Sequence, residues 1–400
     1  MSRVQALVGD RDEKFGAMLS GVRAVAQKAA QRRDEIDRAA KFPADLFDEL
    51  ESTGAFRVCA PRKFGGLEMS LAQLNALVFE GARGLGSLGW LIMVGTSQSI
   101  GSGLYPEETV QKIFGDNEYV RTRGVIAPKG VAVPVEGGFL ISGQWPFATG
   151  GPKPDYVSGN SIVMVDGKPR LGPTGHPEAI IAMMPASEVE FLDTWHVIGM
   201  RGTDSCDVKV KDVFVPTAMT FNLMAPSTCF DTPVARLPLR VALSFPHCAL
   251  ALGIAQGAID DLTELAKTKR ASMNPAALMG DDIAFRHDLG RRTVQLAAAK
   301  AMLDRFADEC WAAGEARREL APQQILTTRL MANYITSECV EIVDWAYTAG
   351  GSSSVFDGSS LQTRFRDIHV ATQHASCHAD AYRLLGAVML GEELTPQQLF

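Results

Sequence analysis

The chain has little that would direct it to a membrane or to nucleic acid. It lacks an apolar run of the roughly 18 residues that span a bilayer, and its first residues lack the uninterrupted apolar core of a secretory signal. Its 39 lysines and arginines are outnumbered by 46 aspartates and glutamates, so no basic surplus is available to follow a phosphate backbone. We therefore expect a cytoplasmic protein with neither a membrane nor a nucleic acid as partner.

The seven cysteines lack the spacing of a metal site or a redox pair. We expect them to be reduced and mostly structural, because free cysteine usually behaves as a small apolar residue. Cys377 lies close to His374 and His378, which are four residues apart and would share one face of a helix. No third ligand is evident there, so we predict no metal site, and we assign no role to His369 or His378.

The spacing of apolar residues changes twice along the 400 residues. Helical periodicity gives way, from residue 119 to 217, to short apolar runs separated by Gly, Pro and Asp, and helical spacing then returns near Arg236. One of the later helices is expected to run from about Asp367 to Leu390. The order favours an α+β architecture rather than a doubly wound parallel sheet. We expect an N-terminal helical domain (1–118), a central antiparallel β domain (119–222) and a C-terminal four-helix-type bundle (223–400).

Four strings, spread over most of the chain, carry a resemblance to a known superfamily. They are APRKFGGLEMS (60–70), GGFLISGQWPFATG (137–150), DTWHVIGMRGTDSCDVKVKDVFVP (193–216) and AGGSSSVFDGSSLQTRFRDIHVATQH (349–374). In this order they resemble landmarks of the acyl-CoA dehydrogenase superfamily. The resemblance implies an acyl-CoA dehydrogenase-like fold and a homotetramer.

Within that superfamily, the string WPFATG from Trp145 to Gly150 resembles the two-component flavin-dependent monooxygenases. Dehydrogenases usually have W-(I/V)-(T/S)-N-G at this point, whereas the monooxygenases have W-x-F-(A/S)-(S/T)-G. This second resemblance implies a flavoprotein that receives reduced FMN or FADH2 from a separate NAD(P)H:flavin reductase. It would use O2, through a flavin C4a-hydroperoxide, to hydroxylate a small aromatic substrate.

Two dehydrogenase features are absent. Removing a weakly acidic proton next to a thioester needs a positioned carboxylate, and no glutamate follows Asp367 until Glu392. The helix after Arg236 offers no carboxylate at the alternative position. The R-x-x-F-G string with which dehydrogenases hold FAD is also missing, which implies that flavin is bound loosely and exchanges.

The resemblance also implies site residues. Thr149 would lie at flavin N5, with Trp145 and Phe147 beside the ring, and His374 would act as the acid and base because an imidazole titrates near neutral pH. The remaining flavin contacts implied by the resemblance are Trp195 and Arg201, together with Gly350, Gly351 and Ser352 from a neighbouring subunit.

The substrate region departs from the phenolic-acid hydroxylases. The apolar helix that begins near Trp90 lacks their histidine, and Val125 and Ile126 stand where a serine is expected. The pocket is therefore predicted to be apolar and to take an indole-like or other poorly ionised aromatic. Its predicted substrate-binding residues are Trp90, Val125 and Ile126, with Ser97 and Gln98 as polar anchors.

Three other interpretations remain open from the sequence. The chain could be an acyl-CoA dehydrogenase that lacks the usual base. It could also be a flavin-dependent N- or S-oxygenase, because the same oxygen chemistry serves any suitable nucleophile. A catalytically inactive scaffold that only binds a partner is the third.

Overall fold

Helices form the first third of the chain in the computed structural model, which describes residues 3–115, 120–172, 175–223, 228–271, 274–377 and 380–395. The breaker string PRKFGG forms a tight turn in which Gly65 has a φ of +74°. Ser70 then begins the next helix: its hydroxyl accepts from the Gln73 backbone N–H, and the Gln73 side chain accepts from the Ser70 N–H. The helices are α1 (Arg3–Gln31), α2 (Arg33–Ala39), α3 (Ala44–Ser52), α4 (Leu71–Gly84), α5 (Gly86–Ser102) and α6 (Glu107–Val110).

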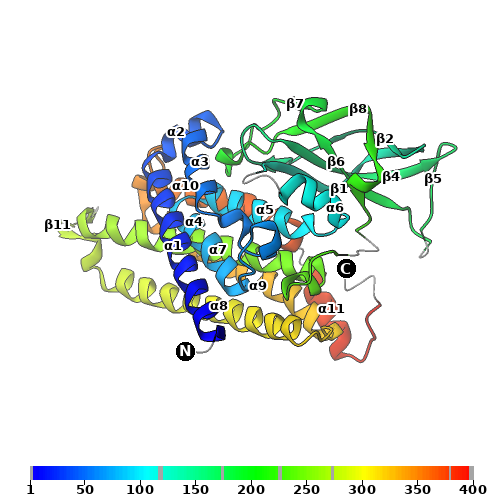
Figure 1. Cartoon of the computed structure of the whole chain (residues 1–400). Helices are drawn as coiled ribbons and strands as arrows, with labels where there is room; N and C mark the ends of the chain where they lie inside the picture. Colours follow the sequence, from blue (N-terminus) through cyan, green and yellow to red (C-terminus); the bar gives the residue numbers. More distant parts are fainter. Residues whose placement is uncertain are drawn as a thin grey trace.

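The strands form a sheet beside the helices (Figure 1). Its hydrogen-bonded order is β7-β8-β2-β1-β4-β6-β9, with β3 also pairing with β1 and β5 with β4. The bounds are β1 (Thr122–Val135), β2 (Gly138–Trp145), β3 (Thr149–Gly150), β4 (Tyr156–Val165), β5 (Lys168–Pro169), β6 (Ala179–Pro185), β7 (Glu190–Leu192), β8 (Asp207–Pro216) and β9 (Thr220–Phe221).

The expectation of a wholly antiparallel sheet is wrong at one pair, because β1 and β4 run parallel. The reason lies in the path of the chain. Strand β2 runs back along β1, and β3 pairs with Arg123 and Gly124 near the first residues of β1. Strand β4 therefore starts at the same end as β1, with Tyr156 opposite Thr122, and continues in the same direction. The sheet is mixed.

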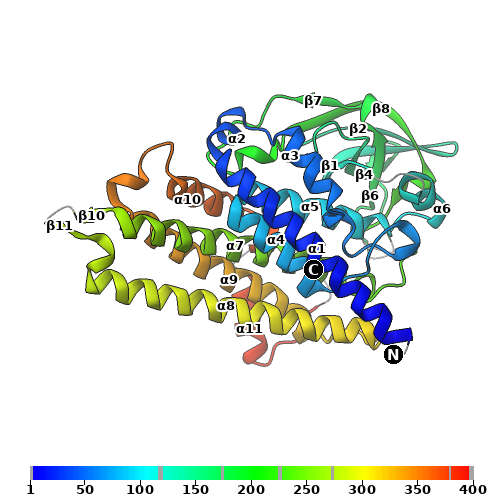
Figure 2. The same cartoon turned by 60° about the vertical axis from the view of Figure 1, so that its left-hand side comes forward.

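The C-terminal helices lie alongside one another (Figure 2). By its length and composition, helix α7 could cross a membrane. The expectation that no segment of the chain is long and apolar enough to do so is therefore wrong. However, 89% of its most apolar 18-residue window is buried inside the protein, where it packs against α4, α9 and α10. The bounds are α7 (Leu239–Thr268), β10 (Arg270–Ala271), β11 (Asn274–Leu278), α8 (Ile283–Glu315), α9 (Pro322–Ala349), α10 (Ser360–Ala371) and α11 (Asp380–Met389).

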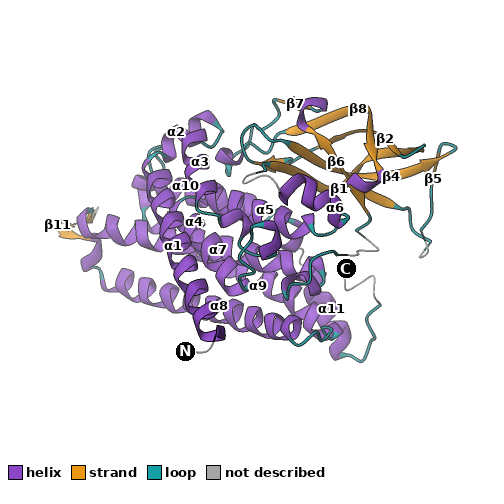
Figure 3. Ribbon diagram, in the orientation of Figure 1, coloured by secondary structure: helices purple, strands orange, loops and turns teal. Residues whose placement is uncertain are grey.

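The helices lie together beside the sheet (Figure 3). The N-terminal and C-terminal helices share one hydrophobic core, and the sheet has its own. Buried residues of the helical core extend in sequence from Met18 to Ala371. The sheet core extends from Val125 to Val215. The predicted site residues are divided between the helices, with Trp90 in α5 and His374 after α10, and the sheet, with Thr149 in β3.

The expected continuous helix around His374 is interrupted. Helix α10 ends at Ala371, where the Thr372 hydroxyl donates to the carbonyl of His369 at 2.6 Å. His374 lies in the turn that follows, and its carbonyl accepts from the Cys377 N–H at 2.9 Å. The prediction that His374 and His378 share one face of a helix is therefore wrong for His374, which lies outside a helix. His378 itself lies outside the described residues.

Trp145 is enclosed by three glycines of the sheet. Its side chain is 0% exposed, and its Nε1–H donates to the carbonyl of Asn160 at 2.6 Å. A Cβ on Gly130, Gly143 or Gly159 would overlap the indole or come into close contact with it. The predicted contact of Trp145 with flavin is therefore wrong, because the ring fills the sheet interior.

The enclosure of Trp145 predicts a stability cost for a methyl group. We expect Gly130→Ala to lower the free energy of unfolding by about 1–3 kcal/mol, because the added Cβ overlaps the indole in a packed core. Urea denaturation followed by circular dichroism measures the change. Gly101→Ala is the matched control, since nothing lies within 4 Å of a Cβ at that helical position. Equal midpoints for both variants would contradict the packing described here.

Candidate functional site

Three aromatic side chains from distant parts of the sequence meet between the helices. The imidazoles of His247 in α7 and His374 in the turn after α10 stack with centroids 4.8 Å apart and an interplanar angle of 15°. The indole of Trp90 in α5 meets both rings edge to face, at 5.7 Å from His374 and 6.3 Å from His247. We call Trp90, His247 and His374 the aromatic cluster.

Burial keeps the imidazoles of the aromatic cluster neutral. His247 is fully buried, and both burial and the nearby His374 hold its pKa well below the usual value. Burial also lowers the pKa of His374, which is partly exposed. At pH 7 both rings are therefore uncharged, so each can accept a hydrogen bond through one nitrogen and donate through the other.

His247 is connected to a thiol on one side and has a free nitrogen on the other. Its Nε2 lies 2.9 Å from the Sγ of Cys377, which in turn donates to the Thr336 hydroxyl at 3.4 Å. Burial raises the pKa of Cys377, so the thiol is protonated at neutral pH. Within the described part of the chain, the buried Nδ1 of His247 has no hydrogen-bond partner. A buried polar atom of this kind fits a site that receives a ligand.

Trp90 joins the aromatic cluster to the sheet. Its Nε1–H donates to the hydroxyl oxygen of Thr149 in β3 at 3.3 Å. That hydroxyl lies 2.6 Å from the Ser205 hydroxyl, which lies 2.8 Å from the Thr203 hydroxyl. The Thr203 hydroxyl donates to the carbonyl of Met200 at 2.9 Å. We call Thr149, Ser205 and Thr203 the hydroxyl relay.

A buried arginine fixes the loops that hold the hydroxyl relay. Arg123 is almost fully buried and pairs with the Asp204 carboxylate at 2.9 Å. Its guanidinium also donates to the carbonyls of Asp204, Gly151 and Ala148. The side chain thereby connects β1 to the residues on both sides of Thr149 and to the residue before Ser205. This arginine was not singled out from the sequence.

Gln98 and Ser97 are engaged with the protein itself. The Gln98 amide donates to the Thr149 carbonyl at 3.3 Å and accepts from the Thr122 hydroxyl at 2.5 Å, so it connects α5 to the sheet. The Ser97 hydroxyl donates to the carbonyl of Met93 one turn earlier in the helix. Gln98 thus supports Thr149 rather than presenting a free amide as a substrate anchor.

Phe147 presents an unpartnered face. Its backbone has a φ of +63°, which is uncommon for a bulky residue, and its side chain is 66% exposed. The ring lies edge to face with buried Trp195 at 6.2 Å, and the Trp195 Nε1–H donates to the carbonyl of Arg201 at 3.0 Å. An exposed aromatic ring two residues from Thr149 fits a planar ligand such as flavin.

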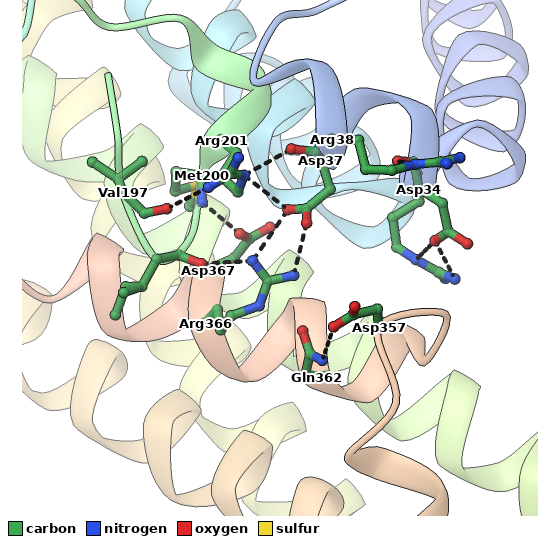
Figure 4. A network of polar contacts seen from close by, with 12 residues as sticks. Asp34, Asp37, Arg38, Val197, Met200, Arg201, Asp357, Gln362, Arg366 and Asp367 are labelled. Carbon is green, nitrogen blue, oxygen red and sulfur yellow. Dashed lines mark hydrogen bonds and ion pairs between the residues drawn. The ribbon is translucent and has the colours of Figure 1, made fainter. Parts of the chain in front are cut away.

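Figure 4 shows the polar network around Met200 and Arg201, in the loop between β7 and β8. The buried carboxylate of Asp367 accepts from the Met200 N–H at 2.6 Å. Arg201 donates to the carbonyls of Asp37 and Val197, and Arg366 pairs with the Asp37 carboxylate at 3.1 Å. The predicted contact of Arg201 with flavin has no support in this arrangement, because the guanidinium is engaged with α2 and its own loop.

Other predicted residues do not reach the aromatic cluster. Val125 packs in the core of the sheet, and the Ile126 side chain is exposed on its surface. Gly350, Gly351 and Ser352 lie at the end of α9, where the Gly350 carbonyl accepts from Lys269. Gly351 has a φ of +55° that favours glycine. The role of this turn in a neighbouring subunit stays a prediction.

The aromatic cluster and the hydroxyl relay together suit proton transfer and exclude some other chemistries. No carboxylate takes part in the hydrogen bonds described for Trp90, Thr149, His247 or His374, so the base of a dehydrogenase is missing at this place. Across the ranges described above, no three His, Cys, Asp or Glu side chains are grouped so as to hold a metal ion. The groups at this place that can transfer a proton are the neutral imidazoles and the threonine hydroxyl.

Comparison with known proteins places this site in a family. The "Acyl-CoA dehydrogenase, N-terminal domain" and "Acyl-CoA dehydrogenase, C-terminal domain" families match residues 12–105 and 245–379. Indole-3-acetate monooxygenase of Pseudomonas putida is 30% identical over 388 residues, which cover 96% of this chain and 95% of that protein. The structure of 3-HSA hydroxylase from Rhodococcus sp. RHA1 aligns with a TM-score of 0.87 at 23% identity, over 96% of this chain and 99% of that one.

A further solved structure shows the same fold. The complex of TdsC, a dibenzothiophene monooxygenase of a Paenibacillus species, with FMN and indole has a TM-score of 0.80 at 20% identity and covers 96% of this chain and 100% of that one. The acyl-CoA dehydrogenase fold, the aromatic cluster and the near full-length match define an oxygenating flavoprotein rather than a dehydrogenase. The chain belongs to the flavin-dependent monooxygenases of this fold, as an oxygenase component that uses reduced flavin and O2.

Asp367 predicts a pH dependence of stability. Burial raises its pKa to about 6, against an unfolded value of about 3.9. The folded state therefore favours the protonated carboxyl, and this contribution, roughly 3 kcal/mol, is fully present below about pH 4 and lost as the pH rises through about 6. We expect Asp367→Asn, which keeps an oxygen for the Met200 N–H, to become more stable relative to the parent protein over that interval.

Urea denaturation between pH 4 and pH 7.5 measures this difference. Asp166→Asn, which removes an exposed carboxylate between β4 and β5, is the control for the loss of one negative charge. A stability difference between Asp367→Asn and the parent that stays constant with pH would rule out the titration of this carboxyl.

Proposed function

We propose that the chain hydroxylates a neutral, planar aromatic substrate of the indole type. The observation that carries the proposal is the aromatic cluster itself: Trp90, with the two stacked imidazoles of His247 and His374, offers apolar faces and uncharged nitrogens. A charged group in that place would have no partner and a high desolvation cost. Two similar proteins support an indole-type substrate: one is named indole-3-acetate monooxygenase, and the other was solved in complex with indole.

Each residue of the site has a separate role in the proposed reaction. Reduced flavin, when bound, supplies the electrons that activate O2. Thr149 would contact flavin N5, with the exposed ring of Phe147 beside the flavin plane.

The Nδ1 of His374 accepts from the Ser376 N–H at 3.3 Å, so Nε2 carries the proton of the neutral ring. His374 would donate this proton to the activated oxygen and then take up the proton that the substrate loses on hydroxylation. His247 holds the His374 ring by stacking. The Cys377 proton goes to Thr336, so Nε2 carries the ring proton of His247, and the unpartnered Nδ1 would accept from a polar edge of the substrate.

The partners of the proposed enzyme follow from the family. An oxygenase component needs a separate NAD(P)H:flavin reductase, from which reduced FMN or FADH2 diffuses, and the relatives named as oxygenase components support this. We also propose a homotetramer in which Gly350, Gly351 and Ser352 of one subunit contact the flavin of its neighbour. A cytoplasmic location is proposed with it, since a reductase and NAD(P)H are needed.

Isotope incorporation tests the proposed reaction. Purified protein, a flavin reductase, NADH and FMN or FAD would be incubated under 18O2 with indole, phenol, indole-3-acetate or dibenzothiophene. We expect one 18O atom in a hydroxylated product of the neutral aromatic ring, with catalytic turnover. Labelled oxygen on sulfur or nitrogen alone would replace the proposal by S- or N-oxygenation. Oxidation of an acyl-CoA with no labelled product would favour a dehydrogenase, and reduced flavin that fails to bind would favour an inactive scaffold.

Substitutions at the proposed catalytic residues predict separable defects. We expect His374→Ala to lower the hydroxylation rate by about 100-fold or more while flavin binding is retained, because a positioned acid or base contributes at least that factor. Thr149→Ala should instead raise the hydrogen peroxide released per NADH consumed. Product mass and peroxide are both measured.

The control for His374→Ala is His369→Ala, since the His369 ring is engaged with Asp344 at 3.0 Å and with Phe365 and does not join the aromatic cluster. Coupled turnover at the parent rate in His374→Ala would remove that residue's proposed role. An unchanged peroxide yield in Thr149→Ala would do the same for Thr149.

A further inference from the structure

Both ends of the hydroxyl relay have a fixed hydrogen-bond polarity. At one end the Met200 carbonyl can only accept, and it receives the Thr203 hydroxyl proton at 2.9 Å. At the other end the Trp90 Nε1–H can only donate, and it points to the Thr149 oxygen at 3.3 Å. The Trp90 contact is compatible with either direction of the Thr149 proton, so the Met200 end sets the direction of the two hydroxyl contacts between them, at 2.6 and 2.8 Å.

The direction of each proton follows from one end to the other. Thr203 uses its only hydroxyl proton on the Met200 carbonyl, so the contact with Ser205 requires the Ser205 hydroxyl to donate. Ser205 then has no proton left for Thr149, and the Thr149 hydroxyl donates to Ser205. A hydroxyl has one proton and two lone pairs. Thr149 therefore keeps one free lone pair, after Trp90 has taken the other, and has no proton to offer a ligand.

The surroundings hold this arrangement in place. Thr149, Ser205 and Thr203 are 4%, 3% and 1% exposed, so water does not compete for their hydrogen bonds. Met200, which anchors the relay, is held through its N–H by the buried carboxylate of Asp367 (Figure 4). The Met200 carbonyl also accepts from the Thr203 N–H at 3.1 Å and the Trp195 Nε1–H at 3.3 Å, and reversing the relay would break its shortest hydrogen bond, the buried one from the Thr203 hydroxyl.

We propose that Ser205 and Thr203 are positioning residues that make Thr149 an obligate hydrogen-bond acceptor and thereby select reduced over oxidised flavin. The inference rests on the proposed placement of Thr149 at flavin N5. Reduced flavin carries a proton on N5, which the free lone pair of Thr149 can accept. Oxidised flavin presents a lone pair on N5, which faces the lone pair of Thr149 and finds no donor. The relay thus favours capture of the reduced form and release of the oxidised one.

Binding constants for the two redox forms test the relay without turnover. The dissociation constant of oxidised FMN is measured by fluorescence titration, and that of dithionite-reduced FMN by anaerobic ultrafiltration; FAD is treated in the same way. In Ser205→Ala, the Thr149 proton loses its acceptor and can turn to oxidised N5. We expect oxidised flavin to bind about tenfold more tightly, the factor of one neutral hydrogen bond, and reduced flavin to bind as before.

Further variants keep the test informative. Thr203→Val, which keeps the shape of the side chain, frees the Ser205 proton to turn towards Thr149 and should give the same selective gain for oxidised flavin. Ser205→Thr retains the hydroxyl and should restore the parent ratio. Ser102→Ala is the matched control, because that buried serine donates to the carbonyl of Ser99 and lies outside the relay.

The outcomes separate the relay from the proposed function. A gain confined to oxidised flavin in Ser205→Ala and Thr203→Val, with rescue by Ser205→Thr, supports the relay. Equal weakening of both redox forms would mean a packing defect and would overturn it, as would a parent protein that prefers reduced flavin but an unchanged ratio in both variants. A parent protein that binds neither form of FMN or FAD would instead refute the proposed function.

Discussion

The buried hydrogen bond between the Asp367 carboxylate and the Met200 N–H is the constraint on which the site depends. It joins α10 to the loop before β8, and both elements continue directly into functional residues. Met200 ends the hydroxyl relay, and the helix that carries Asp367 ends at Ala371, three residues before His374. Gly86 and Gly199 permit the approach, since a Cβ on either would overlap Asp367 or the backbone of α10. One carboxyl group therefore fixes the distance between the sheet-side and helix-side parts of the site.

The groups of the aromatic cluster and the Cys377 thiol beside it carry no charge at neutral pH, and this limits how much water the site attracts. Burial lowers the pKa of both imidazoles and raises that of the Cys377 thiol, so all three groups are neutral at pH 7. On the sheet side, the buried Arg123 is paired with Asp204. Such a site holds few fixed charges that would draw water in, which suits a reaction in which water diverts activated oxygen to peroxide.

The sequence predicted the order of elements, the superfamily and three of the residues that meet at the site, because WPFATG and the R-D helix are local strings with a fixed place in the fold. It missed His247, since one histidine in the apolar run of α7 is typical of a core helix; only Pro246 before it, which removes a backbone N–H, hinted at a special position. Ser205 was missed because its role depends on Thr149, 56 residues away. The parallel β1–β4 pair was missed because it joins strands more than 30 residues apart. The break before His374 was missed because short-range bonds from Thr372 and Cys377, rather than a change in apolar spacing, end the helix there.

The shared helical core also constrains how the chain folds as it is made. Residues from Met18 to Ala371 belong to one buried cluster, with α4 and α5 packed on α7 and α10. While the ribosome is still synthesising the sheet, the N-terminal helices can pack on one another but not yet on α7 or α10. The helical body can close only after α10 has left the ribosome. In the meantime the first helices present apolar surface that a chaperone would recognise.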